Sequence, residues 1–327
     1  MRSNSKQAFR QQQRLQTYAA STTVDTFCRL LETPDMATTL PAHRERIYPP
    51  IKTLSMFMAQ ALGTDRSCQN AVNNLAVHKA VQHSQPVSTS TGGYCQARMR
   101  LPVSLISNLV SQSGDLMDQQ VREAWRWRNR RVRLIDGTTV SMQDTARNQE
   151  KYPQSGTQKP GLGFPVCRVL GVICLSSGAV LNAAIGPCKG KGSDEQSLLR
   201  KVFPTFQTGD LVLGDAFFGT FFLLASLVAN GMDGVFEQMG VRRRGTDFQK
   251  GQSLGSKDHI IQLTKPAKKP DWITQQDYDS APNELAIREL HTGGRTLITT
   301  LLCPKIAPKG ELKKLYKKRW QIEVDFR

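Results

Sequence analysis

Two strongly apolar segments, each carrying one aspartate, constrain this fold more than any other feature of the sequence. In RLIDGTTVSM the strand formers Leu134 and Ile135 precede Asp136, and the following glycine predicts a turn or bulge. In LVLGD an apolar strand is predicted to end at Asp215. A carboxylate in such surroundings is costly to bury unless something compensates its charge, as a divalent ion does. Either aspartate alone is more simply a turn residue or a helix cap, so only the pair predicts a metal site.

The segments around these aspartates predict an α/β fold with a mixed sheet. The predicted elements, in chain order, are a hairpin of 166–175 and 180–185, a helix capped at 193–195, the strand ending at Asp215, a helix over 221–229 and a strand over 234–237. Residues 241–305 are basic, polar and punctuated by Gly and Pro. We expect them to form a β-rich insertion, with short strands at 259–263 and 296–302.

Residues 1–125 are predicted to be predominantly helical. Apolar residues fall at helical spacing before Gly63, which predicts a helix end, and a second helix is expected to start directly after it. This pair is typical of a helix-turn-helix, although many helical hairpins with such a pattern only pack in a core. Pro102 predicts the start of a further helix. Residues 1–20 are rich in Gln and Arg and are predicted to be a mobile arm that orders on DNA.

The net charge of +17 indicates a polyanionic partner. Up to residue 130 the chain has 16 basic and 8 acidic residues, and beyond it 28 and 19, so both halves are basic. This distribution excludes a basic tail on a neutral enzyme and favours nucleic acid along the whole length. The alternative is charge that serves solubility alone.

The seven cysteines are scattered and contain no Cys-x-x-Cys pair, which argues against a zinc ribbon and against a disulfide framework. The N-terminus lacks the apolar core of a signal peptide, and no apolar run is long enough to span a bilayer. We therefore predict a cytoplasmic protein in a reducing compartment, with no membrane partner.

The last predicted helix, 308–327, carries three polar side chains at helical spacing. Tyr316, Arg319 and Glu323 stand at i, i+3 and i+7, which places a phenol, a guanidinium and a carboxylate on one helical face. For the helix alone, a solvated ion pair between Arg319 and Glu323 is the simpler interpretation.

Together the segments RLIDGTTVSM, LVLGDAFFGTFF and LYKKRWQIEVDFR resemble the three catalytic blocks of DDE transposases of the insertion-sequence-four family. The last block of that family has the pattern Tyr, two residues, Arg, three residues, Glu, six residues, Lys, and Tyr316, Arg319 and Glu323 fit its spacing. The segments TLSMFMAQALGTDRSCQNAV and TGGYCQARMRLP resemble the helical DNA-binding portion of the same family. The resemblance covers most of the chain.

The resemblance implies a ribonuclease-H-like catalytic domain at 126–327, with the insertion at 241–305, preceded by a helical DNA-binding domain at 1–125. Asp136, Asp215 and Glu323 would bind two Mg²⁺ ions, which Mn²⁺ can replace. The implied activity is cut-and-paste transposition. Water cuts the transposon end to free a 3′ hydroxyl, and that hydroxyl attacks the opposite strand or the target DNA.

The implied partners are double-stranded DNA, as inverted-repeat ends and as target, and a second copy of the chain in a homodimer in the bacterial nucleoid. Tyr316 and Arg319 would hold phosphate oxygens near the cut. The run Arg242, Arg243 and Arg244 would meet phosphates beside the site, or else form a solvated loop. Trp272 would stack on an extruded base, or more simply pack in a small core.

The sequence departs from the family pattern in two places. Where some relatives place a base-stacking Trp, this chain has Gly294-Arg295-Thr296. The Lys that ends the last block would fall beyond Arg327, which predicts a fragment or the product of a decayed or frameshifted gene. Two alternatives follow, a ribonuclease-H-like nuclease without strand transfer and a catalytically dead DNA-binding repressor.

Overall fold

The computed structural model describes residues 46–81, 85–157, 159, 161–190, 192–240 and 245–321. The chain divides into two compact units, Met1–Asn108 and Leu109–Arg327. Each unit is described by itself. The predicted arm at residues 1–20 lies outside the described residues.

The described part of the first unit is helical. Its helices are α3 (Pro50–Leu62), α4 (Cys68–Val81), α5 (Gly92–Met99) and the first residues of α6 (Val103–Gln119). Gly63 ends α3 as predicted, whereas α4 begins later than expected and α5 was not predicted. Tyr94 of α5 explains why this short helix forms. Its ring packs in a core with Val72, and its hydroxyl donates to Gln60 Oε1 at 2.8 Å.

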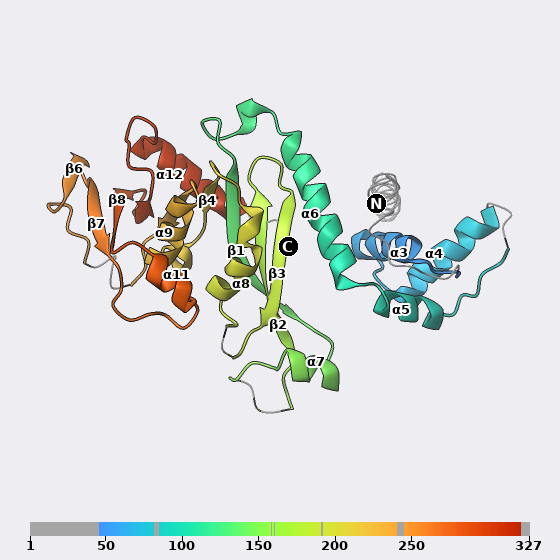
Figure 1. Cartoon of the computed structure of the whole chain (residues 1–327). Helices are drawn as coiled ribbons and strands as arrows, with labels where there is room; N and C mark the ends of the chain where they lie inside the picture. Colours follow the sequence, from blue (N-terminus) through green and yellow to red (C-terminus); the bar gives the residue numbers. More distant parts are fainter. Residues whose placement is uncertain are drawn as a thin grey trace, which may run out of the picture. The chain divides into compact units, whose positions relative to one another are not determined.

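Nine strands of the second unit form one mixed sheet within the described residues (Figure 1). The strands are β1 (Val132–Ser141), β2 (Val166–Cys174), β3 (Val180–Pro187), β4 (Leu211–Leu213), β5 (Asp233–Glu237), β6 (Gln252–Gly255), β7 (Asp258–Thr264), β8 (Glu284–Thr292) and β9 (Arg295–Thr299). Their order is β3-β2-β1-β4-β5-β9-β8-β7-β6, with β1 parallel to β4 and β4 parallel to β5. The remaining pairs are antiparallel. This arrangement confirms the predicted ribonuclease-H-like α/β fold.

Short helices complete the second unit. They are α7 (Ala146–Lys151), α8 (Glu195–Val202), α9 (Phe221–Ala229), α11 (Gln275–Ser280) and α12 (Lys309–Lys317), with the 3-10 turns η1 (Glu123–Trp125), η2 (Phe203–Thr205), η3 (Ala216–Phe218) and η4 (Lys318–Trp320). Asp194 caps α8 by accepting from the Ser197 amide at 3.0 Å, which confirms the predicted cap. None of the helices in the described part of the chain is long and apolar enough to cross a bilayer.

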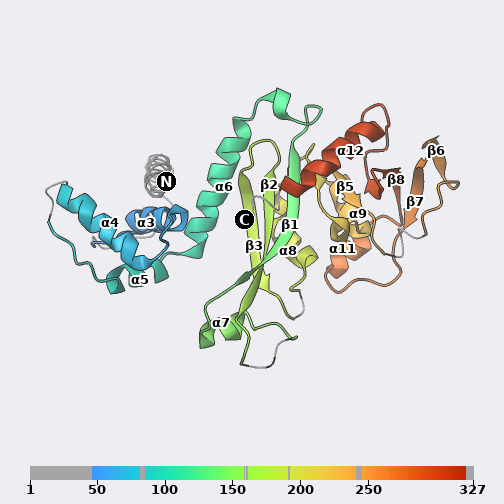
Figure 2. The ribbon, with the colours of Figure 1, turned by 180° about the vertical axis from the view of Figure 1, so that it is seen from behind.

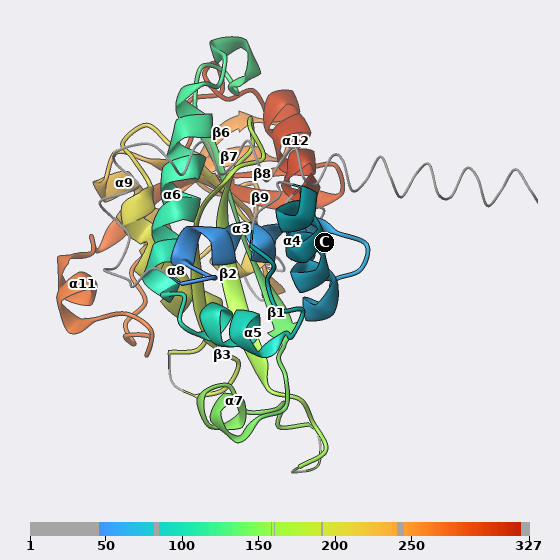
Figure 3. The same ribbon diagram turned by 90° about the vertical axis from the view of Figure 1, so that its right-hand side faces the viewer.

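Side chains of β1 and β4 alternate between two helical layers. Ile135 and Val212 pack in one core with residues of α8 and α9, whereas Leu134 and Leu213 pack in another with residues of α12. The edge-on view shows α9 and α11 on one side of the strands and α12 on the other (Figure 3), and the view from behind brings α12 to the front (Figure 2). Because alternate residues of a strand face the same side, Asp136 faces the α12 layer together with Leu134.

Three expectations about these elements are wrong. β1 runs straight through Asp136 and Gly137, which pair with residues of β2, so no turn or bulge forms there. β4 ends at Leu213, and Asp215 follows it in a loop. The last predicted helix, 308–327, is not continuous. α12 ends at Lys317, and residues 318–320 form a 3-10 turn. The β-rich insertion does form, and it extends the central sheet because β9 pairs with β5.

A buried ion network joins α6 to the sheet. Arg133 of β1 is 2% exposed and donates to both carboxylate oxygens of Asp118 at 2.8 and 2.7 Å, and Nε donates to Asp210 at 3.1 Å. Burial lowers the pKa of Arg133, but the hydrogen bonds and charges of these carboxylates outweigh it and hold the pKa above its usual value. For Asp118, burial raises the pKa, yet the bonds from Arg133 bring it below the ordinary value.

We expect Arg133→Ala to lower the free energy of unfolding by about 3–5 kcal/mol, because Asp118 loses its buried cation and Asp210 keeps only the ion pair with Arg131. Urea denaturation of the purified variant measures the change. Arg122→Ala, at an exposed position, is the matched control and should stay within about 0.5 kcal/mol of the parent. Equal effects of the two substitutions would contradict this role.

The same network predicts a loss of stability in acid. The pKa of Asp118 is lower in the folded chain than its unfolded value of about 3.9, so its contribution is complete above that value and disappears as the pH falls through the folded pKa. Asp118→Asn has no such contribution. The gap in unfolding free energy between parent and Asp118→Asn should therefore narrow as the pH falls below about 4. A gap independent of pH would exclude this linkage.

Candidate active site beside two parallel strands

Asp136 lies within β1 on the side of α12. One carboxylate oxygen accepts from the Gly137 amide at 2.9 Å, and the other lies 3.5 Å from a guanidinium nitrogen of Arg319. The side chains of Asp136 and Arg319 are 14% and 8% exposed. The carboxylate is thus held at the edge of the core with a cation beside it, which lowers the cost of keeping its charge there.

Asp215 reaches the same end of the sheet from the neighbouring strand. Leu134 of β1 pairs with Leu213 of β4, and Asp136 and Asp215 each follow two residues after these paired leucines. One oxygen of Asp215 accepts from the Phe217 amide at 2.8 Å, so this residue does cap the following turn, η3. The second oxygen has no such bond to the turn. Capping and a ligand role are therefore compatible.

Tyr316 and Arg319 approach this end of the sheet from α12 and the turn η4. Tyr316 is 5% exposed, and its hydroxyl is buried without a hydrogen-bond partner among the described residues. Burial raises the pKa of Tyr316 to about 12, the charge of Arg319 opposes the rise, and the charges of Glu237 and Asp215 add to it. The phenol is therefore a neutral donor at physiological pH, close to several charged groups.

Two further acidic residues, which the sequence analysis did not single out, lie at this end of the sheet. Glu237 is the last residue of β5 and forms an ion pair with Arg295 of β9. Glu195 is the first residue of α8. Burial is the largest cause of its raised pKa, and the charges of Asp215 and Asp136 raise that pKa further. The segment VFE, an apolar strand ending in a carboxylate, repeats the pattern of LVLGD and was the available signal for Glu237.

A cavity of about 210 Å³ adjoins Tyr316 between the β8–β9 hairpin and α12. Its lining includes Arg295, Lys313, Lys317 and Trp320. The guanidinium carbon of Arg319 lies 4.5 Å from the Trp320 ring centre. The wall of this cavity is therefore basic and aromatic, a combination suited to an anionic ligand.

Residues 127–327 match the family model of the transposase DDE domain. The chain belongs to the DDE transposases. It is also similar to the transposase InsG for insertion sequence element IS4 of Escherichia coli strain K12, with 26% identity over 241 residues. That match covers 71% of this chain and 51% of the relative, so the chain spans about half the relative's length. Both findings confirm the resemblance to the insertion-sequence-four family.

The structure of this transposase brings together four of the eight predicted site residues. Asp136 lies beside Arg319, and the charges of Asp215 and Arg319 both act on Tyr316, so the four residues lie in one region. Glu323 lies outside the described residues, and so do Arg242, Arg243 and Arg244. The described residues contain no group of three side chains placed to hold a metal ion. Members of this family generally use a divalent metal, and the two aspartates offer the oxygen donors that such an ion prefers.

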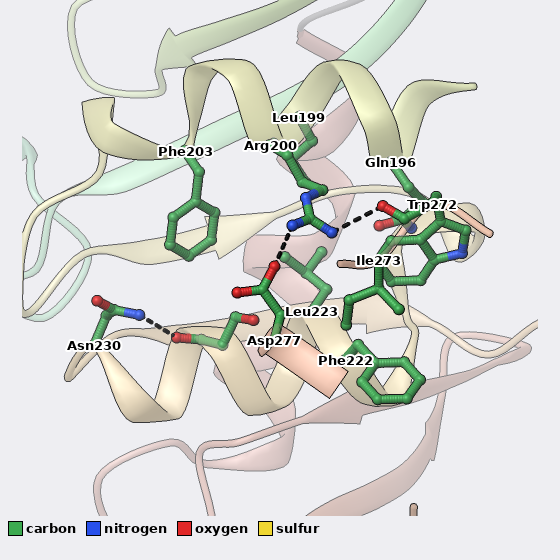
Figure 4. Close-up of a pocket in the computed structure, with 11 residues that line it drawn as sticks. Gln196, Leu199, Arg200, Phe203, Phe222, Leu223, Asn230, Trp272, Ile273 and Asp277 are labelled. Carbon is green, nitrogen blue, oxygen red and sulfur yellow. Dashed lines mark hydrogen bonds and ion pairs between the residues drawn. The ribbon is translucent and has the colours of Figure 1, made fainter. Parts of the chain in front are cut away.

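Another cavity of the DDE domain, of about 230 Å³, lies away from these aspartates, between α8, α9 and α11 (Figure 4). Arg200 crosses it, donating to the carbonyl of Trp272 at 2.8 Å and pairing with Asp277. The ring of Trp272 packs edge-on against Phe222, with centroids 6.0 Å apart. Trp272 thus has the core-packing role that was the simpler of its two interpretations.

We expect Tyr316→Phe to leave the transposase as stable as the parent or slightly more stable, because a buried hydroxyl without a partner contributes no hydrogen bond. Tyr278→Phe is the control, since that hydroxyl donates to the carbonyls of Pro266 and Ala267 at 3.0 and 2.8 Å. The control should cost about 1 kcal/mol of unfolding free energy. A loss of similar size for Tyr316→Phe would mean that its hydroxyl is bonded within the protein.

Proposed function

We propose that this chain is a cut-and-paste DNA transposase that cleaves phosphodiesters at transposon ends and transfers the freed strand. The observation that carries the proposal is that Asp136 and Asp215 each follow the paired Leu134 and Leu213 by two residues, inside a domain of the transposase family. Two-metal cleavage is the established use of such a pair. The runner-up functions, a nuclease without strand transfer and a DNA-binding repressor, differ from it in their products.

Asp136, Asp215 and Glu323 would hold two Mg²⁺ ions, and Mn²⁺ would substitute for them. The donor set fits, because it consists of carboxylate oxygens and contains no thiolate or imidazole. When bound, the ions supply Lewis-acid stabilisation to the attacking and leaving oxygens. Each aspartate uses one oxygen for a backbone amide, to Gly137 and to Phe217, which fixes the orientation of its second oxygen.

The side chains of α12 and η4 would position the DNA. A guanidinium offers paired donors to phosphate oxygens, and Arg319 stands beside Asp136 with only 6% of its surface exposed. The unpartnered hydroxyl of Tyr316 would donate to the same phosphate or its neighbour. Both donors are already oriented by packing, which lowers the reorganisation needed when DNA binds.

The proposed partners are the inverted-repeat ends, the target DNA and a second copy of the chain, with the two copies pairing the ends. The net charge of +17 supports strong, salt-dependent attraction to DNA. Arg242, Arg243 and Arg244 would add phosphate contacts from the start of the β-rich insertion. The basic wall of Lys313 and Lys317 beside Tyr316 extends this attraction to the site itself.

We expect Asp136→Ala, Asp215→Ala and Glu323→Ala each to abolish cleavage of end DNA while changing its binding less than threefold, since the carboxylates act on the reaction and not on DNA affinity. Cleavage and joining are measured on labelled ends with Mg²⁺ or Mn²⁺, and binding by fluorescence anisotropy. The exposed Asp271→Ala is the matched control and should cut at the parental rate.

The products separate the proposed function from its runners-up. Joined strands support transposition, and cleavage without joining supports a nuclease. Binding to ends with no cleavage in either metal would support a repressor. A triad variant that cuts at the parental rate would remove that residue from the site.

A further inference from the structure

Glu195 reaches the active-site edge from the side of the sheet opposite α12. It is the first residue of α8, whose apolar residues Leu198 and Leu199 pack in the core on that side. Its side chain is 23% exposed, and one carboxylate oxygen lies 3.9 Å from Arg168 Nε of β2. Arg168 also donates to the Ser193 carbonyl at 2.9 Å, so it holds both the loop before α8 and the first side chain of the helix.

The carboxyl group of Glu195 occupies the space that a side chain at position 137 would fill. A Cβ added to Gly137 would lie 2.4 Å from Glu195 Cδ and 2.5 Å from Oε1. Gly137 alternates with Asp136 along β1, so it faces the α8 side while Asp136 faces α12. The glycine that the sequence suggested for a turn therefore permits a close approach, and it brings a third carboxylate next to the Asp136 backbone.

Electrostatics support the same placement. Burial is the largest cause of the raised pKa of Glu195, Arg168 opposes it, and the charges of Asp215 and Asp136 raise the pKa further. The three acids therefore share one region although no three of them are spaced as a ready metal site. On the α12 side of this region the Tyr316 hydroxyl is buried without a hydrogen-bond partner among the described residues, so a donor is available there to a ligand.

We propose that Glu195 is a further carboxylate of the active site and contributes to binding the divalent ion held by Asp136 and Asp215. This inference rests on the proposed function. A fixed negative charge beside the two aspartates strengthens their attraction for a cation, and its oxygens accept bonds from the ion's water ligands. The simpler role for an acid in the first turn of a helix is interaction with the helix dipole, which affects stability and not ion affinity.

The test is Mn²⁺ binding to the full chain at constant pH, with free Mn²⁺ followed by electron paramagnetic resonance. We expect Glu195→Gln to weaken Mn²⁺ affinity about tenfold or more, because the charge is lost while the shape is kept. Glu195→Asp, which keeps the charge, should bind more tightly than Glu195→Gln. The exposed Glu284→Gln is the matched control and should bind as the parent does.

Gly137→Ala provides a second, independent variant, because its methyl group would displace the Glu195 carboxylate. It should weaken Mn²⁺ binding in the parent and add little in the Glu195→Gln background, since the two changes act on one contact. Thermal unfolding of each variant identifies any change that comes from lost folding.

The outcomes separate this inference from the function on which it rests. Parental affinity in Glu195→Gln, with affinity lost in Asp136→Asn, overturns the role of Glu195 and leaves the proposed function intact. Absence of Mn²⁺ binding and of cleavage in the parent overturns both. Reduced affinity in Glu195→Gln and Gly137→Ala, with Glu284→Gln unchanged, supports the inference.

Discussion

The parallel pairing of β1 with β4 determines where the chemistry of this chain can take place. A parallel pair requires a long crossover, and here the β2–β3 hairpin and α8 form that crossover between strands more than sixty residues apart in the sequence. The pairing places Leu134 of β1 opposite Leu213 of β4. Two residues after each leucine the chain carries an aspartate, Asp136 or Asp215. A shift of one residue would turn Asp136 towards α8 and away from Arg319. The register is therefore as important to the site as the aspartates themselves.

The two cores on either side of the sheet fix this register. The core under α12 holds Leu134 and Leu213, and the core under α8 and α9 holds Ile135 and Val212, so a slipped strand would expose apolar residues on both sides. Arg133 adds a polar constraint, because it has to meet Asp118 and Asp210 at the opposite end of the strands from the aspartates. Strand position is thus specified by apolar packing and by a buried ion network together.

At the active-site end of the sheet, three acidic side chains each have an arginine nearby. Asp136 lies beside Arg319, Glu237 pairs with Arg295, and Glu195 lies near Arg168. Each carboxylate therefore has a cation nearby in a partly buried place, and this end of the sheet does not repel a polyanion as a bare acidic cluster would. This balance is what a site needs if it has to attract both a divalent cation and a DNA backbone.

The sequence by itself determined the order and type of most elements of the second unit, the two aspartates that accompany β1 and β4, and the helix that carries Tyr316. These are local properties, set by apolar periodicity, helix caps and spacing along one helix. Only the tertiary structure decided that Gly137 continues the strand and leaves room for Glu195. It also placed Glu237 and Arg295 at the site and gave Trp272 a partner in Phe222. Such contacts join residues far apart in the chain. They depend on register and on which face of the sheet a side chain occupies, and no local pattern contains that information.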